Sequence, residues 1–261
     1  MNSLNQSLAI EADGTGRWRS AASRSYEAGN GMLGGWTAAL LLKVVMSDPV
    51  AEGSVSTLSV NFISRVEPGS ALTLVNRRLG GGRSITHWQS ELLSEQGALL
   101  ALATVILAHR RPSDAFCEQA MPDAFAPETL SPSGPPEPFA ANLDLRVALG
   151  AKYLDQSSSR SLTWEKEVSD APLDELQIAM LSDIGPPRIF YYSQSPRPSA
   201  TSTLSVYFHA TPEEIATCGN DFVLSDMVGT RGEQSTFGTK KDMWSRSGNL
   251  LASSEQMCWF R

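Results

Sequence analysis

One acidic residue of this chain, Asp183, stands where its chemistry depends on burial. Leu173, Leu176, Met180 and Asp183 recur at three- and four-residue spacing, so a helix would place these four side chains on one face. A carboxyl on such a face is either solvated at the helix end, or buried with a raised pKa and able to act as a base. The turn residues Gly-Pro-Pro follow at 185–187, so both interpretations stay open.

Two further candidates come from a repeat within the sequence. The heptads STLSVNF (56–62) and STLSVYF (202–208) are nearly identical. The segment GALLALATVIL from residue 97 also shares a Gly, two Leu and an Ala with GNLLASSEQMC from residue 248. Two pairs of similar segments in the same order favour a duplicated structural unit over a chance similarity between Ser- and Leu-rich strands.

The two copies differ at positions that are apolar in one and polar in the other. Thr201 corresponds to Val55, and Gln256 corresponds to Val105. Burying a polar group costs free energy that packing alone does not require, so we infer that Thr201 and Gln256 serve a function. Both side chains donate and accept hydrogen bonds without titrating.

The first half of the chain indicates one buried helix followed by strands. Segment 30–47, NGMLGGWTAALLLKVVMS, begins with turn residues and is then apolar on nearly every side. Alternating or apolar segments at 55–62, 72–78, 83–93 and 98–109 predict four strands, separated by glycine-containing turns. An antiparallel sheet curled around the helix is the simplest way to cover it.

The second half repeats this order. It contains an extended stretch at 161–168, a helical pattern at 172–184, and strand patterns at 202–208, 222–230, 234–245 and 250–260. Between the copies, residues 112–142 are rich in proline and show no periodicity. We therefore predict an α+β fold with a first repeat at 1–111, a linker at 112–142 lying over the surface, and a second repeat at 143–261.

Composition restricts the class of partner. The formal net charge of −7 and the pI near 5.1 argue against a nucleic-acid partner. The first fifteen residues lack the pattern of a secretory signal, and the apolar stretch 38–46 is too short to span a bilayer, so we expect a cytoplasmic protein without a membrane partner. The spacing of the cysteines and histidines is not that of a metal site, so we expect no disulfide framework, metal or cofactor. The cysteines are Cys117, Cys218 and Cys258, and the histidines are His87, His109 and His209.

Several short motifs, taken in order, resemble those of one family. They are N-G-x-x-G-G at 30–35, G-R-S at 82–84, L-S-D at 181–183, F-H at 208–209 and G-x-L-x-A-x-x-x-Q at 248–256. With the two-copy plan they resemble the double hotdog acyl-CoA thioesterases, of the TesB-like or acyl-CoA thioesterase II type. The resemblance covers almost the whole chain. It implies two tandem hotdog repeats, each an antiparallel sheet around an apolar helix, and hydrolysis of an acyl-CoA to a free acid and CoA.

The resemblance also implies roles for the three polar residues. In that family an Asp, a Thr or Ser, and a Gln of the second hotdog hold and activate the attacking water, and these correspond to Asp183, Thr201 and Gln256. Asp183 would be the base, and no acyl-enzyme is expected. The chain departs from the family at Thr203, where an acidic residue often stands.

Backbone amides at the start of the first helix would complete the chemistry. We expect N–H groups around Leu33, Gly34 and Gly35 to stabilise the oxyanion, because helix starts carry unpaired amides and favour negative charge. Alternatively, the two glycines only permit close packing of the helix on the sheet.

Two other functions and several secondary assignments stay open. A hotdog hydratase or dehydratase would need one of the scattered histidines to meet an acid, and an inactive acyl-CoA-binding module would use the polar trio only for hydrogen bonding.

Trp36 fits the core better than an acyl pocket. Arg78, Arg83 and Arg110 could meet CoA phosphates or face solvent. Exposed sheet edges would permit a homodimer or homotetramer.

Overall fold

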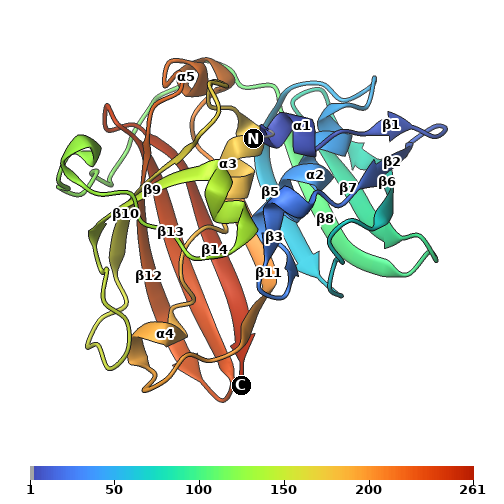
Figure 1. Cartoon of the computed structure of the whole chain (residues 1–261). Helices are drawn as coiled ribbons and strands as arrows, with labels where there is room; N and C mark the ends of the chain where they lie inside the picture. Colours follow the sequence, from blue (N-terminus) through green and yellow to red (C-terminus); the bar gives the residue numbers. More distant parts are fainter. Residues whose placement is uncertain (1–2) are drawn as a thin grey trace.

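A single antiparallel sheet organises the molecule. The computed structural model describes residues 3–261, and its twelve-stranded sheet has the order β1-β2-β6-β7-β8-β5-β11-β14-β13-β12-β10-β9 (Figure 1). The strands are β1 (Glu11–Ala12), β2 (Arg17–Ala21), β5 (Ser54–Phe62), β6 (Ala71–Gly81), β7 (Ile85–Ser94), β8 (Leu99–Ala108), β9 (Leu143–Leu149), β10 (Ser161–Glu167), β11 (Ser199–Phe208), β12 (Val223–Glu233), β13 (Thr236–Ser245) and β14 (Leu250–Phe260).

Shorter elements fill the connections. A small separate sheet pairs β3 (Glu27–Ala28) with β4 (Gly31–Met32). The helices are α1 (Leu4–Ser7), α2 (Gly34–Met46), α3 (Glu175–Leu181), α4 (Ile189–Tyr192) and α5 (Pro212–Ala216), with 3-10 turns at Arg24–Tyr26, Pro127–Thr129 and Pro138–Asn142. No helix in residues 3–261 is long and apolar enough to cross a membrane.

The strand order shows that the two repeats join edge to edge. Six strands of the first repeat and six of the second follow one another in mirrored order, and β5 pairs antiparallel with β11 at the junction. The two STLSV strands are therefore partners: Ser59 lies opposite Ser205, and their hydroxyl oxygens are 3.1 Å apart. The predicted duplication, with one sheet around one helix in each copy, is confirmed.

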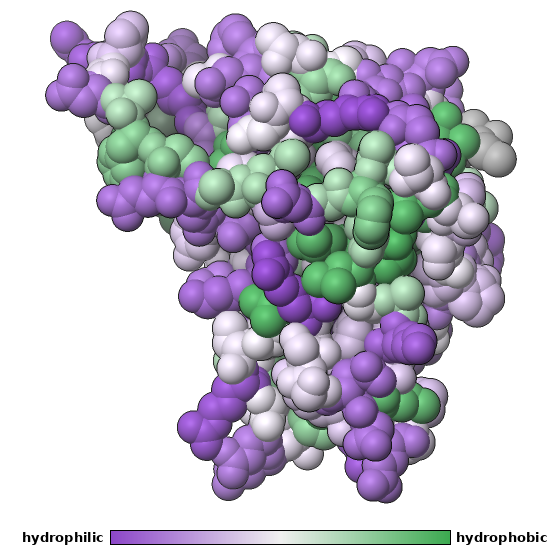
Figure 2. Space-filling view, turned by 90° about the vertical axis from the view of Figure 1, so that its left-hand side faces the viewer, coloured by the Kyte–Doolittle hydropathy of each residue, from purple (hydrophilic) through white to green (hydrophobic). Residues whose placement is uncertain are grey.

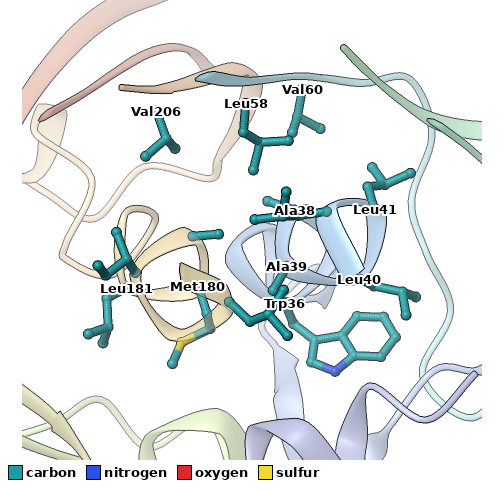
Figure 3. Close-up of a cluster of buried hydrophobic side chains, with 14 of the residues drawn as sticks. Trp36, Ala38, Ala39, Leu40, Leu41, Leu58, Val60, Met180, Leu181 and Val206 are labelled. Atoms are coloured by element: carbon teal, nitrogen blue, oxygen red, sulfur yellow. The ribbon is translucent and has the colours of Figure 1, made fainter. Parts of the chain in front are cut away.

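The two main helices lie together inside the curve of the sheet. Figure 3 shows α2 and α3 side by side, with Leu58, Val60 and Val206 of the central strands pointing at them. Those three residues are at most 1% exposed, and Trp36 and Leu40 of α2 are fully buried. Helix α2 is thus covered on nearly all sides, as its sequence predicts, and Trp36 belongs to the core, with its indole N–H donating to Ser7 Oγ at 3.0 Å.

A bulge occurs at the same place in both repeats. The pairing register shifts between Val55 and Thr57 on β5, and between Thr201 and Thr203 on β11. Leu58 and Leu204 are fully buried, and without the extra residue strict alternation would turn the positions three residues earlier outward. The bulge turns both positions inward, so Val55 is 1% exposed and Thr201 is half-buried. Thr203, which follows the bulge in β11, is exposed to solvent.

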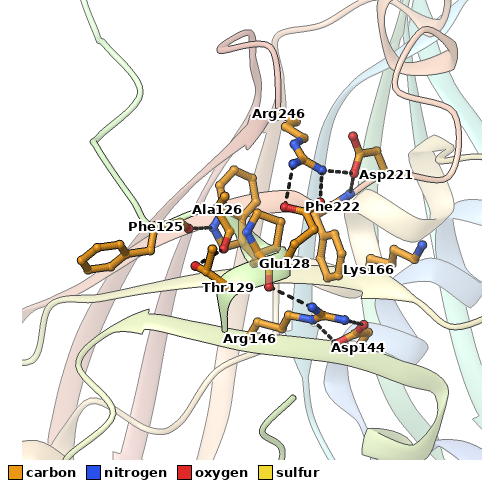
Figure 4. A network of polar contacts seen from close by, with 12 residues as sticks. Phe125, Ala126, Glu128, Thr129, Asp144, Arg146, Lys166, Asp221, Phe222 and Arg246 are labelled. Carbon is orange, nitrogen blue, oxygen red and sulfur yellow. Dashed lines mark hydrogen bonds and ion pairs between the residues drawn. The ribbon is translucent and has the colours of Figure 1, made fainter. Parts of the chain in front are cut away.

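Part of the proline-rich segment packs on the outer face of the second repeat. Met121, Ala124 and Leu130 cover a second cluster of buried hydrophobic residues on β10, β12 and β13. Figure 4 shows how Arg246 binds Glu128. Arg146 also donates to the Pro127 carbonyl at 2.8 Å. On the side of the molecule that bears this repeat, hydrophobic patches lie among hydrophilic groups (Figure 2). The predicted boundaries at 111/112 and 142/143 stay a prediction.

Several short elements were not predicted from the sequence: strands β1, β2, β3, β4 and β9, and helices α1, α4 and α5. Strand β9 nevertheless alternates apolar and polar residues (LDLRVAL). Helix α3 is shorter than the expected 172–184, because the Asp174 side chain caps it by accepting the Gln177 N–H at 2.8 Å, and it ends at Leu181.

Candidate active site

Asp183 lies just beyond α3 and points to the start of α2. Its Oδ2 accepts the backbone N–H of Gly35 at 2.8 Å, and its Oδ1 accepts Gln256 Nε2 at 2.7 Å. The Thr201 hydroxyl lies 3.5 Å from Oδ1, at the limit of a hydrogen bond. The structure therefore brings together Asp183, Thr201 and Gln256, which are up to 73 residues apart, around one carboxylate.

The two interpretations of Asp183 prove compatible. The residue follows the helix end, yet it is only partly exposed and faces a cavity. Burial raises the pKa of the Asp183 carboxyl to about 6, against the opposing effects of the Gly35 N–H, the Lys241 ammonium and Gln256. A carboxyl with a pKa near 6 is ionised at neutral pH and retains more basicity than an ordinary Asp, as a general base requires.

The cavity beside Asp183 belongs to the second repeat. It has a volume of about 80 Å³, and Thr201, Gln256, Thr239, Phe237 and Cys258 are among its lining residues. The bulge in β11 turns Thr201 toward this space, and Thr203, the departure from the family pattern, is exposed and outside the lining. The backbone irregularity thus re-aims the Thr201 side chain.

Gly34 and Gly35 allow α2 to approach Asp183 closely. A Cβ on Gly34 would lie 2.8 Å from Asp183 Oδ2, and a Cβ on Gly35 would lie 2.2 Å from the Met180 carbonyl oxygen. At Gly35 only glycine fits, because the Met180 carbonyl belongs to the backbone, and at Gly34 a Cβ would displace the Asp183 carboxylate. The packing role of the glycines is therefore clear, and the oxyanion role stays a prediction.

The expected set of oxyanion donors changes. The Gly35 N–H is engaged by Asp183, and the Leu33 N–H donates to the Tyr26 carbonyl at 2.9 Å. Within residues 3–261, the Gly34 N–H has no hydrogen-bond acceptor. Sequence reasoning assigned Leu33, Gly34 and Gly35 alike, because it could not see that the Asp183 carboxylate occupies one of these amides.

The other predicted candidates lie elsewhere. None of the three histidines lines the cavity in the described part of the chain; His209, for example, pairs with Ser253. Arg110 donates to the carbonyls of Val55, Phe208 and His209, which is a structural role. Residues 3–261 contain no cluster of three potential metal ligands. Cys258 borders Thr201 at 3.7 Å, but burial raises its pKa to about 12 and keeps it a thiol.

Two residues near the trio were missed by the sequence analysis. Thr239 on β13 is 3% exposed and lies opposite Gln256 of β14. Its buried hydroxyl has no hydrogen-bond partner among the described residues. Lys241, on the same strand, is buried and adds positive charge near Asp183. Extending the 151-residue offset to β13 would have found both, because the corresponding residues of the first repeat are Trp88 and Ser90.

The acid itself has a counterpart that the sequence analysis also missed. Ser47 and Asp48 follow α2 as Ser182 and Asp183 follow α3, and the two turns have matching backbone hydrogen bonds. Asp48 binds Asn76 Nδ2 at 2.9 Å rather than a threonine and a glutamine. The repeats thus differ in what surrounds the acid, and only the second supplies the trio.

Comparison with known families matches both halves of the chain. The model of the acyl-CoA thioesterase N-terminal domain matches residues 22–108, and that of the acyl-CoA thioesterase C-terminal domain matches residues 118–260. None of the curated proteins matches the chain.

Solved structures share the whole fold. A hot dog fold protein of unknown function from Alicyclobacillus acidocaldarius is 26% identical, with a TM-score of 0.94 and coverage of 99% of this chain and 97% of the other. The tesB protein of Mycobacterium avium subs paratuberculosis is 18% identical with a TM-score of 0.81, and acyl-CoA thioesterase II TesB2 of Mycobacterium marinum is 15% identical with a TM-score of 0.79. Each of these two covers 99% of this chain and is covered to 98%. The double hotdog fold is therefore confirmed.

Proposed function

The chain belongs to the acyl-CoA thioesterase family and is a thioester hydrolase, and from this premise we propose that Asp183, Thr201 and Gln256 direct a water molecule onto the thioester of an acyl-CoA. The single observation that supports this assignment most is the hydrogen bonding of Asp183 by Gln256 and Gly35 at the edge of a cavity. Two strands, two helix ends and both repeats contribute to that one carboxylate.

The proposed chemistry is a direct hydrolysis. The water oxygen attacks the thioester carbon and its proton passes to Asp183, while the Thr201 hydroxyl and the Gln256 amide orient the water. Collapse of the tetrahedral intermediate breaks the C–S bond, and the proton held by Asp183 passes to the leaving CoA thiolate, which restores the carboxylate. The neighbouring Cys258 stays protonated, so no covalent acyl-enzyme is needed or favoured.

The Gly34 amide is the proposed oxyanion donor. It lies at the first turn of α2, where unpaired N–H groups and the helix dipole favour negative charge, and a glycine Cα leaves room for the substrate. Its neighbour Gly35 uses the same helix start to orient the base. The acyl-CoA substrate follows from the family, whereas the cytoplasmic location and a homodimer or homotetramer stay predictions.

Thiol release from acyl-CoAs of increasing length, from acetyl-CoA to palmitoyl-CoA, tests the proposal. We expect turnover by the wild type, and a loss of well over about tenfold in kcat for Asp183→Asn and for Gln256→Ala. Wild-type activity should fall as the pH drops through about 6, where Asp183 gains its proton.

Two outcomes would contradict parts of the proposal. Undiminished hydrolysis by Asp183→Asn would exclude this residue as the base. Absence of hydrolysis with every acyl-CoA, accompanied by binding of acyl-CoA, would indicate an inactive binding module instead. Circular dichroism of each variant is the control for folding.

A further inference from the structure

A buried ion pair lies directly behind the turn that carries Asp183. Lys241 on β13 and Glu165 on β10 have side chains that are 1% and 2% exposed. Lys241 Nζ is 3.0 Å from Oε1 and 2.9 Å from Oε2 of Glu165. The strand between them, β12, separates the two residues in the sheet, so the pair spans its inner face.

The same ammonium also binds the turn itself. Lys241 Nζ donates to the Leu181 carbonyl at 2.6 Å and to the Ile184 carbonyl at 3.0 Å. These carbonyls bracket Ser182 and Asp183, and the last carbonyls of a helix have no partner within the helix. A cation there also complements the helix dipole. One side chain therefore fixes the backbone on both sides of the proposed base.

The pair occurs only in the repeat that has the trio. By register, Ser90 and Ser20 of the first repeat hold the places of Lys241 and Glu165. The first repeat folds around α2 with these two small residues, so the fold does not require an ion pair there. Since burying two charges costs more than burying neutral side chains, the pair calls for a functional explanation.

We propose that Lys241, held by Glu165, is a positioning residue for Asp183: it fixes the turn that presents the carboxylate and supplies the positive charge that keeps this carboxylate usable as a base. This inference rests on the proposed function of Asp183. It concerns two residues that are not among those lining the cavity and do not touch the reacting atoms.

The surrounding charges are few and can be named. Asp183 is faced by Lys241 from β13, by the Cys258 thiol from β14 and by the Gly35 N–H from α2. Lys241 is in turn faced by Glu165 from β10 and by the Arg188 guanidinium from the loop after α3. Arg188 donates to the backbone carbonyls of Ser159 and Pro186 and is 1% exposed.

These charges act on Asp183 in opposite directions. The Lys241 charge lowers the pKa of Asp183 against the effect of burial. Burial lowers the pKa of Lys241, and the Glu165 and Asp183 carboxylates oppose that shift. Glu165 thus opposes the effect of burial on Lys241 and offsets part of the field that Lys241 exerts on Asp183.

The pH dependence of kcat/KM in isosteric variants tests the inference. For Lys241→Met we expect the acid limb to move to higher pH by at least about half a unit, because the favourable cation is lost, with a lower plateau because the turn loosens. For Glu165→Gln we expect the limb to move to lower pH, because Lys241, still bound by the Leu181 and Ile184 carbonyls, acts on Asp183 without the opposing carboxylate. Opposite shifts are a result that a merely structural role would not produce.

Two further variants keep the test decisive. The matched control is Lys240→Met, because the neighbouring Lys240 pairs with Glu255 on the surface. This variant should keep the wild-type pH dependence of kcat/KM. The double variant Lys241→Met with Glu165→Gln buries a neutral pair and should fold even if a single variant does not; its limb should lie between those of wild type and Lys241→Met.

The outcomes separate the inference from the function. If wild type is active and Asp183→Asn is not, but the acid limb stays unchanged in the Lys241 and Glu165 variants, the positioning role is wrong and the proposed function stands. If Asp183→Asn remains active, the proposed function fails first and the inference with it.

Discussion

At the scale of single residues, the proposed base reduces the stability of the fold. An Asp carboxyl ordinarily titrates near 3.8, and that of Asp183 titrates near 6 in the folded chain. The folded state therefore binds more protons between these values, and stability falls as pH rises through this window. Above it the cost stays constant at about 3 kcal/mol, an upper bound for a partly exposed group.

Asp183→Asn should therefore stabilise the protein while it abolishes activity. We expect unfolding by urea to require about 1 to 3 kcal/mol more at about pH 7.5, and the gain to disappear near pH 4, where the wild-type carboxyl is also protonated. Asp123→Asn, a change in an exposed residue, is the control. An equal or lower stability of Asp183→Asn at both pH values would mean that the carboxylate is not strained by burial.

At the scale of elements, the sequence predicts helices and strands that have a local pattern, but not features that depend on how the strands pair. Helix α2 and nine of the twelve strands of the large sheet were predictable because each pattern is local. The bulges at 55–57 and 201–203 were not, since a register shift is defined only by the partner strand. The Lys241–Glu165 pair was invisible for the same reason: it joins residues 76 positions apart across an intervening strand.

Strand β13 also differs from its counterpart β7 at the cavity beside Asp183. Trp88 on β7 is 1% exposed and occupies the register position that Thr239 occupies on β13. A large indole therefore fills one repeat where a small side chain lines the cavity of the other. We infer that the exchange of tryptophan for threonine at this position opens the space beside Asp183.

Thr239→Trp should close that space without destroying the fold. We expect kcat/KM for the preferred acyl-CoA to fall by at least about 100-fold, because the substrate can no longer reach the water held by the trio. Near-ultraviolet circular dichroism should show a folded protein, since the first repeat accepts Trp88 at this place. Thr236→Trp, at the exposed start of the same strand, should remain active. An active Thr239→Trp variant would show that the substrate enters elsewhere.

At the scale of the whole molecule, the site exists only where the two repeats meet. The first repeat supplies Gly34 and Gly35 at the start of α2, and the second supplies Asp183 and its partners. The β5–β11 ladder and the packing of α2 on α3 fix these parts relative to one another. In contrast, residues 111–120 are exposed throughout and contain no regular structure, so the covalent link between the repeats contributes little to their arrangement.

Cutting the chain in this exposed segment should therefore leave an active protein. With a protease site inserted after Asp114, we expect the two fragments to elute together in size-exclusion chromatography and to keep at least about half of the activity, because the contacts that build the site lie outside the cut. Each fragment expressed alone should be inactive, since neither contains both Gly35 and Asp183. The uncut variant and protease-treated wild type are the controls. Separation of the fragments in native buffer would show that the shared sheet is too weak to hold the repeats together and that the linker does so.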